Sequence, residues 1–341
     1  MAPAAPTPYV IPLFIPHEGC PHRCLFCNQH SITGRTSRVT AAQARAEIET
    51  WLVRPHDRRR EVQVAFYGGT FTALSRARQE ELLGAVRPYL DDGKVAAVRL
   101  STRPDGIDGE IARFLAGAGV RIAELGVQSM SDEVLARSGR GHTAAQVEEG
   151  VRFLRTAGIA VGAQLMLGLP GETTAGQLAG LRRLLTLRPG FLRLYPALVL
   201  RGSGLAVLYA AGRYQPLSLA KAVALAGKMK TMCDAAGVPV VRMGLQPSPE
   251  LEREIAAGPY HPAFGELVAS RLLFGKVRRE LSRAIARPRV LTVARADESA
   301  FRGRDNSGPR RLAALGLLSE TRIEYRSDQP RQTIRLIMDN G

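Results

Sequence analysis

Three cysteines, Cys20, Cys24 and Cys27, lie within the stretch FIPHEGCPHRCLFCNQHSITG near the start of the chain. Their spacing is C-x3-C-x2-C, and the only other cysteine, Cys233, lies far downstream. Thiolates are soft ligands that suit zinc or iron–sulfur clusters. Both kinds of site usually take four protein ligands. Three clustered thiolates therefore predict a metal site whose fourth position is either filled by a histidine or left open.

Two kinds of metal site satisfy this pattern. In the first, His17, His22 or His30 completes a Cys3His zinc site, although the last ligands of structural zinc usually lie farther along the chain. In the second, an iron–sulfur cluster keeps one iron free of protein ligands. An open metal position is a place where a substrate or cofactor binds.

The segments that must position these cysteines alternate between short apolar runs and longer amphipathic patterns. The expected strands are YVIPLFI, EVQVAFYG, VAAVRLST, RIAELGV, AVGAQLMLG and FLRLYPALV. The spacing of apolar residues predicts helices over Ala41–Arg54, Gln79–Leu90, Asp108–Ala118, Ala144–Ala157 and Thr174–Leu187. This alternation predicts an α/β fold with a parallel sheet, either an incomplete β/α barrel or a doubly wound sheet.

Polar and glycine-rich segments follow each expected strand. They are the cysteine segment, YGGTFT, STRPDGI, GVQS, GLPGET and LYPALVLRGSG, in chain order. Because the carboxyl ends of parallel strands meet at one edge of the sheet, we expect a single large site there.

The pattern changes after about residue 246. A basic helix is expected over Glu266–Ala286, and RVLTVA, RIEYRS and TIRLIM are expected strands beside a helix near Pro309–Leu317. The sequence therefore predicts a main domain over residues 8–247 and a small C-terminal α+β extension over residues 248–341.

The composition predicts a globular cytoplasmic protein. Its residues are 45% hydrophobic and 23% charged, and no run approaches the roughly 20 apolar residues of a membrane span. The N-terminal MAPAAPTPYVIPLF has no basic segment ahead of its apolar run, and four cysteines are too few for a disulfide framework. The net charge of +16 favours a polyanion such as RNA, but an excess of arginine is also typical of GC-rich genomes.

The C-x3-C-x2-C motif after a first expected strand resembles the signature of the radical SAM superfamily. This resemblance implies a partial (β/α)6 barrel of the TIM type and two cofactors, a 4Fe-4S cluster held by Cys20, Cys24 and Cys27 and S-adenosylmethionine (SAM) at the open iron. It also implies reductive cleavage of SAM to a 5′-deoxyadenosyl radical, with electrons from a low-potential donor such as ferredoxin or flavodoxin.

The same resemblance implies roles for residues at the other strand ends. Gly68, Gly69 and Thr70 in YGGT match a segment near the methionine amino group of SAM. Gln128 in GVQS matches a ribose contact, and Arg140 matches an arginine that pairs with the methionine carboxylate.

Two further segments belong to this expected cofactor site. Gly168 and Leu169 in GLPGET match the segment against adenine, and Phe26 matches an apolar side chain between the last two cysteines. Gln164 stands where related enzymes that make porphyrin precursors have an acidic residue, which is a departure from their pattern.

Four segments also resemble the radical SAM half of the Elongator catalytic subunit and its stand-alone bacterial relatives: STRPD (101–105), ELGVQS (124–129), RGHT (140–143) and LRLYPALVLRGSGLAVLYAAGRYQPLS (192–218). This resemblance covers residues 8 to 247 and implies tRNA, or another RNA, as the substrate. The residues after 247 carry no acetyl-CoA fingerprint, and the cysteine spacing is that of the superfamily and differs from Elongator's. The alternatives are a radical SAM enzyme acting on a small metabolite such as a tetrapyrrole, and a zinc-stapled RNA-binding module.

Residues near the expected mouth of the barrel are candidates for substrate contact. Tyr195, Arg193 and Arg103 are the expected catalytic residues, because an arginine can meet a phosphate and a tyrosine can stack on a base. The other candidates are Tyr67, Arg201, Arg242, Tyr260 and His261. Cys233 lies in an expected helix and is predicted to be a small core residue.

Overall fold

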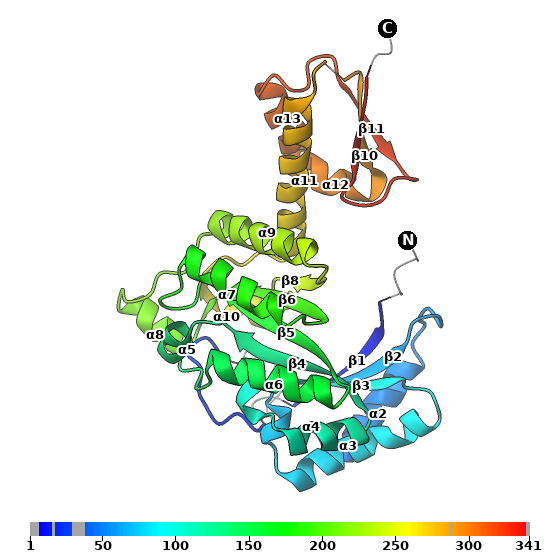
Figure 1. Ribbon diagram of the computed structural model, residues 1–341, viewed down its shortest axis with the longest axis vertical. Helices are drawn as coiled ribbons and strands as arrows, with labels where there is room; N and C mark the ends of the chain where they lie inside the picture. Colours follow the sequence, from blue (N-terminus) through cyan, green and yellow to red (C-terminus); the bar gives the residue numbers. More distant parts are fainter. Residues whose placement is uncertain (1–6, 16–17, 29–37, 287, 339–341) are drawn as a thin grey trace. The chain divides into compact units, whose positions relative to one another are not determined.

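The computed structural model describes residues 7–15, 18–28, 38–286 and 288–338 (Figure 1). The chain divides into two compact units. The first unit takes in Met1–Ser218 and Met229–Tyr260, and the second takes in Leu219–Lys228 and His261–Gly341. The domains predicted from the sequence, residues 8–247 and 248–341, meet at a boundary that differs from those of the two units. The predicted domain boundary remains a prediction.

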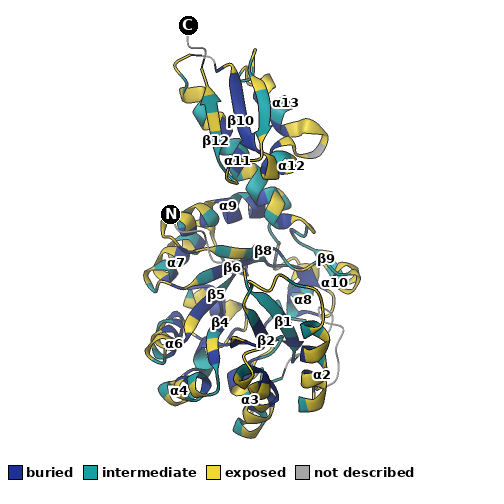
Figure 2. Ribbon diagram, turned by 90° about the vertical axis from the view of Figure 1, so that its right-hand side faces the viewer, coloured by how far each residue is buried: buried dark blue, intermediate teal, exposed yellow. Residues whose placement is uncertain are grey.

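The first unit is built on a seven-stranded parallel sheet in the order β1-β2-β3-β4-β5-β6-β8. These strands are β1 (Tyr9–Phe14), β2 (Val62–Tyr67), β3 (Ala97–Thr102), β4 (Val120–Gln128), β5 (Ala160–Leu167), β6 (Phe191–Pro196) and β8 (Val240–Met243). A doubly wound sheet reverses its strand order part of the way across, and this sheet does not. Of the two predicted architectures, the structure has the incomplete barrel, and Figure 2 shows its strands in a curved row.

Helices lie on the outer side of this sheet in Figure 2. They are α2 (Ala41–Leu52), α3 (Arg76–Asp91), α4 (Gly109–Gly117), α6 (Ala144–Thr156) and α7 (Thr174–Thr186). All five predicted helices are confirmed within a few residues. Most begin at a Thr, Ser or Asp whose side chain accepts a hydrogen bond from the first turn, and Thr40 and Thr143 form complete capping boxes with Gln43 and Gln146.

Two strands of the first unit were not predicted, and one predicted strand is divided in two. The strand β8 is short and half-exposed, so its apolar pattern is weak. The predicted strand FLRLYPALV is divided after Pro196 into β6 and β7 (Val199–Leu200), and β7 pairs antiparallel with β9 (Ile255–Ala257). The remaining elements of this unit are η1 (Phe71–Ala73), η2 (Pro104–Gly106), α5 (Asp132–Arg137), α8 (Gly204–Ala210) and α10 (Pro249–Glu254), with α9 (Leu219–Ala235) shared between the units.

The second unit is a three-stranded sheet with helices, as the predicted α+β extension requires. The strand β10 (Val290–Ala294) is central, with β11 (Arg322–Arg326) parallel and β12 (Ile334–Ile337) antiparallel to it. The long helix α11 (Phe264–Arg283) supplies Leu273, Val277 and Leu281 to its core. The other elements are η3 (Arg295–Asp297), α12 (Glu298–Arg302), η4 (Arg304–Asn306) and α13 (Ser307–Ala314).

No described helix combines the length and the apolar character that crossing a membrane requires.

Candidate functional site

The cysteine segment follows β1 and is held by backbone hydrogen bonds from several strand ends. The amide of Thr70, after β2, donates to the carbonyl of Glu18 at 3.0 Å. The amide of Leu25 donates to Ser138 O at 3.0 Å, and its carbonyl accepts from the Leu205 amide at 2.8 Å. The segment is therefore fixed by residues that follow β2, β4 and β7, as expected if the strand ends form one site.

The thiols of the segment contact other predicted site residues. Cys20 Sγ lies 3.3 Å from Thr70 Oγ1, and Cys24 Sγ accepts a hydrogen bond from Arg140 Nη1 at 3.5 Å. Cys24 is buried, whereas Cys20 and Cys27 are half-buried. In the described part of the chain, no three His, Cys, Asp or Glu side chains lie close enough to share one metal ion. A four-iron cluster does not require that, because each thiolate binds a different iron.

Gly69 lies where β2 meets the cysteine segment, and a side chain there would collide with backbone. A Cβ atom at Gly69 would lie 2.6 Å from the carbonyl oxygens of both Ile15 and Glu18. Only glycine allows this approach, so the structure requires Gly69 for the packing of the cysteine segment itself. Its predicted contact with SAM remains a proposal.

Arg140 and Gln128 lie together at the end of β4. Arg140 Nη2 donates to Gly126 O at 2.7 Å, and a Cβ at Gly126 would lie within 3 Å of both side chains. Gln128 is the last residue of β4 and has a positive φ of 67°. Arg140 Nε and Gln128 Oε1 are buried without a hydrogen-bond partner among the described residues. Burial lowers the pKa of Arg140.

These observations fit the predicted cofactors. Buried polar atoms without partners are uncommon in folded proteins, and they call for a polar ligand or water. The unpartnered donor is Arg140 Nε and the unpartnered acceptor is Gln128 Oε1. They lie, with three thiols of the kind that iron binds, at the edge of the sheet where the cofactors were predicted.

The segment after β5 also packs against the cysteine segment. Phe26 packs against a cluster of Val134, Leu169 and Ala197. The carbonyl of Gly168 accepts a hydrogen bond from the Tyr214 hydroxyl at 2.7 Å. Nearby, Ser129 Oγ donates to Glu172 Oε2 at 2.8 Å, and burial raises the pKa of Glu172.

A second cluster, which we call the inner ionic cluster, consists of Tyr67, Arg99, Glu124, Arg193 and Tyr195. Glu124 is fully buried, and its carboxylate oxygens lie 2.7 Å from Arg99 Nη2 and from Arg193 Nε. The Tyr67 hydroxyl donates to Glu124 Oε1 at 2.9 Å, and Arg193 Nη1 lies 3.5 Å from the Tyr195 hydroxyl. These contacts join β2 to β4 and β4 to β6, which are not neighbours, so the cluster lies on the concave face of the sheet.

Contacts within the inner ionic cluster keep Tyr67 neutral and Arg193 positively charged. Burial and the Glu124 carboxylate raise the pKa of Tyr67, so the phenol stays protonated. Burial acts to lower the pKa of Arg193, but Glu124 and the two tyrosines outweigh it and raise the pKa. With two arginines around one carboxylate, the cluster carries one uncompensated positive charge.

The other predicted residues lie outside this cluster. Arg103 is buried and makes a two-pronged pair with Asp105 at 2.9 and 2.8 Å. Arg201 donates to a backbone carbonyl, and Arg242 donates to a backbone carbonyl and to the Gln246 side chain. The Tyr260 hydroxyl donates to Glu252, and the ring of His261 accepts from the Ala263 amide. Gln164 is half-buried on β5, and Cys233 is fully buried, as predicted. His17 and His30 lie outside the described residues.

Sequence reasoning missed Glu124 and Arg99 as members of the site. The signal was present, because Arg99, Glu124 and Arg193 are charged residues inside otherwise apolar strands. Such residues are rarely buried unless they are paired. His142 was also missed. Burial and the neighbouring Arg140 lower the pKa of His142 to about 3, so its imidazole is neutral.

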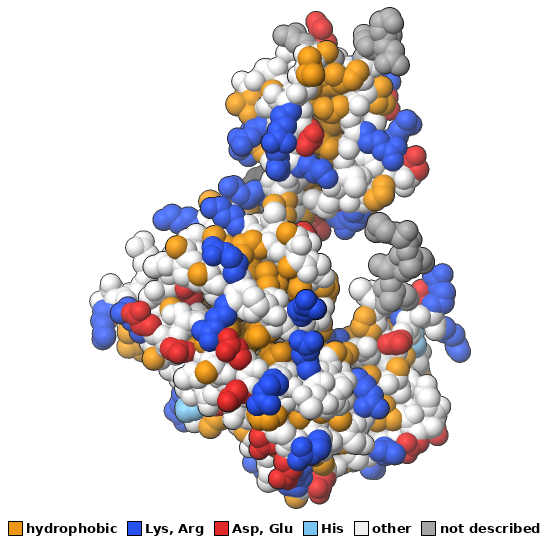
Figure 3. Space-filling view, viewed as in Figure 1, with side chains coloured by type: hydrophobic (Ala, Val, Ile, Leu, Met, Phe, Trp, Pro, Cys, Tyr) orange, Lys and Arg blue, Asp and Glu red, His pale blue; other side chains and the backbone are white. Residues whose placement is uncertain are grey.

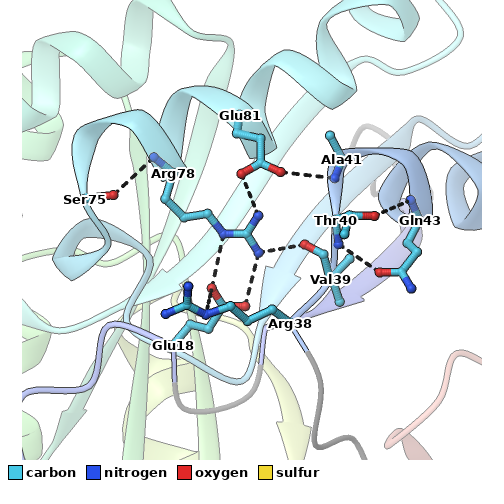
Figure 4. Close-up of polar contacts among 9 residues, drawn as sticks. All are labelled: Glu18, Arg38, Val39, Thr40, Ala41, Gln43, Ser75, Arg78 and Glu81. Atoms are coloured by element: carbon cyan, nitrogen blue, oxygen red, sulfur yellow. Dashed lines mark hydrogen bonds and ion pairs between the residues drawn. The ribbon is translucent and has the colours of Figure 1, made fainter.

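Arg78 of α3 connects Glu18, in the cysteine segment, to Val39, just before α2 (Figure 4). Its guanidinium donates to both oxygens of Glu18 at 3.2 Å and to Val39 O at 2.6 Å. Glu18 lies two residues before Cys20, and Val39 lies just before α2. Arg78 also pairs with Glu81 at 2.9 Å, and Glu81 in turn accepts from the first amide of α2. One side chain thus joins residue 18 to residue 39.

Replacing Arg78 with alanine is therefore expected to loosen the cysteine segment. The loss leaves the Glu18 carboxylate with only its 3.9 Å ion pair to the exposed Arg38, which favours separation of residues 18 and 39 by about 1–3 kcal/mol. Anaerobically reconstituted Arg78→Ala should release iron to a chelator roughly 5- to 150-fold faster than the parent. Arg87→Ala is the matched control, because Arg87 lies on the same helix and its pair with Asp91 is exposed. Equal iron release from both variants would show that the contacts of Arg78 do not hold the cysteine segment in place.

Comparison with known proteins gives two family matches. The Radical SAM superfamily model matches residues 14–176, and the Radical_SAM C-terminal domain model matches residues 189–273.

Three curated relatives are similar over parts of their length. Elongator complex protein 3 of Danio rerio is 31% identical over 188 residues, 49% of this chain and 34% of that protein. The tRNA uridine(34) acetyltransferase of Dehalococcoides mccartyi is 30% identical over 236 residues, 58% of this chain and 50% of that protein. The heme chaperone HemW of Lactococcus lactis is 28% identical over 177 residues, 52% of this chain and 46% of that protein. The chain thus matches half or less of the length of each.

Two solved structures share the fold. The archaeal Methanocaldococcus infernus Elp3 with an N-terminal deletion superposes with a TM-score of 0.61 at 21% identity, covering 78% of this chain and 63% of that one. Coproporphyrinogen III oxidase (HemN) from Escherichia coli superposes with a TM-score of 0.51 at 19% identity, covering 69% of this chain and 54% of that one.

Proposed function

The chain belongs to the radical SAM superfamily of enzymes, and we propose that it modifies a base of tRNA or another RNA. The observation that carries the proposal is the 30% identity over 236 residues to a protein named tRNA uridine(34) acetyltransferase. The net charge of +16 supports it, because basic proteins attract the phosphates of RNA.

We assign the cofactors of the family, a 4Fe-4S cluster and SAM, to the edge of the sheet at β1, β2, β4 and β5. Cys20, Cys24 and Cys27 would hold the cluster. Arg140 would pair with the methionine carboxylate, and Gln128 would accept from the ribose, each through an atom that is now unpartnered. Gly68, Gly69, Thr70, Gly168, Leu169 and Phe26 complete the assigned site. When bound, the two cofactors supply a 5′-deoxyadenosyl radical that removes a hydrogen atom from substrate.

The inner ionic cluster would meet the substrate. Arg193 is charged and partly exposed on the concave face, so it can pair with an anionic group such as a phosphate. Tyr195, whose hydroxyl lies beside Arg193, can stack on a base. Glu124 would hold Arg193 in place, and Arg99 would in turn hold Glu124. Neither Glu124 nor Arg99 would touch substrate. Arg103 is committed to Asp105, so we propose a supporting position for it behind Arg140.

One experiment tests the RNA proposal. Anaerobically reconstituted protein is given SAM and a reductant, with and without bulk tRNA, and deoxyadenosine is measured. We expect tRNA to stimulate its formation and the nucleosides of the recovered tRNA to contain a new product. Cleavage that is indifferent to tRNA would overturn the RNA substrate while leaving the family chemistry intact.

A second candidate is a radical SAM enzyme acting on a tetrapyrrole. It is favoured by the 28% identity to a protein named heme chaperone HemW. The same assay separates the two candidates when coproporphyrinogen or heme replaces tRNA.

The assignment of Arg140 makes a separate prediction. Arg140→Ala is expected to weaken SAM binding by about 1.5–3 kcal/mol, the range for a hydrogen bond to a charged group. Calorimetry on reconstituted protein measures the affinity, and iron content in the same sample shows whether the cluster survives. Arg121→Ala, at the exposed opposite end of β4, is the control. Unchanged affinity in Arg140→Ala would remove Arg140 from the SAM site.

A further inference from the structure

The positive charge of the chain is concentrated in the second unit. Its 91 residues contain 18 Lys and Arg against 9 Asp and Glu, a net charge of +9. The 250 residues of the first unit contain 29 against 22, a net charge of +7. About a quarter of the chain thus carries more than half of the excess charge, which an even supply of arginine would not produce.

A groove with an apolar floor opens on this unit between α13 and the edge strand β11. It has a volume of about 440 Å³, within the range of small-molecule sites. Leu318, Ile323 and Tyr325 line it and belong to the margin of the unit's core. Figure 3 shows apolar side chains on the second unit with basic side chains on either side.

Arginines stand at the rim of the groove. Arg302 and Arg310 both line it and both are exposed. Arg302 pairs with Glu298 at 3.1 Å, whereas the structure records no ion pair for Arg310 within the described chain. The Arg310 guanidinium is therefore available to an anion.

We propose that this groove binds a single-stranded segment of RNA, with a base against Tyr325 and phosphates at Arg310 and Arg302. The inference rests on the proposed RNA substrate and adds a second contact, within the second unit, for the same RNA. Proteins that bind single-stranded nucleic acid combine a positive groove with aromatic side chains on which bases stack. An apolar peptide would use the floor of the groove but would leave Arg310 without a partner.

The test measures binding of fluorescently labelled bulk tRNA to the full chain over a range of salt concentrations. Arg310→Glu is expected to weaken binding roughly tenfold and to lower the slope of log affinity against log salt by about 0.7, the value for one phosphate contact with a single strand. Arg335→Glu is the matched control, because Arg335 is an exposed arginine on β12, the opposite edge of the same sheet. It should change affinity less than about twofold if the site is local.

Substitutions of Tyr325 test the stacking contact. Tyr325→Leu keeps an apolar side chain but removes the ring, and it should weaken tRNA binding by at least about fivefold. Tyr325→Phe keeps the ring and should bind as the parent does, and circular dichroism of both variants shows whether each retains the fold. Weak binding by both variants would overturn stacking at this residue.

The outcomes separate this inference from the proposed function. If tRNA stimulates SAM cleavage but Arg310→Glu binds tRNA no more weakly than Arg335→Glu, the groove is not the RNA site and the function stands. If tRNA neither binds nor stimulates cleavage by the parent, both proposals fail. If Arg310→Glu lowers the stimulation of SAM cleavage at low tRNA concentration, and saturating tRNA restores that stimulation, the groove is confirmed as a docking site.

Discussion

Replacing any one of Cys20, Cys24 and Cys27 with alanine is expected to abolish reductive SAM cleavage and to prevent stable reconstitution of a 4Fe-4S cluster. With one iron already left for SAM, the loss of a thiolate leaves only two protein ligands for the cluster.

Two measurements should agree for each cysteine variant. Iron and sulfide content with the visible absorbance of the cluster report on assembly, and deoxyadenosine formation reports on chemistry. Cys233→Ala is the matched control, because Cys233 is fully buried in α9 and should not affect iron content. Full SAM cleavage by any one of the three cysteine variants would show that the motif does not hold the cluster. A protein that binds stoichiometric zinc and no iron would favour the Cys3His alternative.

The second large effect is expected at Glu124. Glu124→Ala removes the only carboxylate from the inner ionic cluster and leaves Arg99 and Arg193 facing each other on the concave side of the sheet. Removing one partner of a buried ion pair destabilises proteins by about 3–5 kcal/mol, because the remaining charge is left buried without a compensating charge. A loss of that size approaches the whole stability of many domains.

A surface ion pair of the same length provides the control. Arg137 and Glu133 lie 2.7 Å apart, as Arg99 and Glu124 do, but their side chains are 59% and 69% exposed where those of Arg99 and Glu124 are 7% and 0% exposed. Glu133→Ala should therefore cost about 0.3–0.5 kcal/mol. The chain has one tryptophan, Trp51 in the first unit, so its fluorescence during urea unfolding reports on that unit alone. Equal effects of the two substitutions would show that the inner ionic cluster does not stabilise the fold.

The first unit was largely predictable because its signals are local. Strands buried on both faces read as continuous apolar runs, and helices that begin at Thr40, Thr143 and Thr173 carry their own caps. The strand β8 was missed because it has only four residues and pairs along one side only. Its place in the sheet is set by tertiary contact with β6, which no local pattern encodes.

The candidate site was predictable where residue type is sufficient and unpredictable where partners decide. The thiols and YGGT stand out by composition. By contrast, the pairing of Arg103 with Asp105 and of Arg193 with Glu124 depends on curvature of the sheet and on rotamers. The sequence therefore indicated which arginines were candidates, but it could not indicate which of them are already engaged by a carboxylate.

The cysteine segment follows the first strand, yet the chain that secures it comes much later. Leu25 is held by the backbone of Ser138 and Leu205, and Gly204 approaches it so closely that a Cβ there would lie 2.5 Å from the Leu25 side chain. During synthesis on the ribosome, the three thiols thus emerge early and remain without their support until β7 and the start of α8 have been made. We expect the nascent thiols to be exposed to oxidation in that interval, and insertion of the cluster to follow synthesis of most of the first unit.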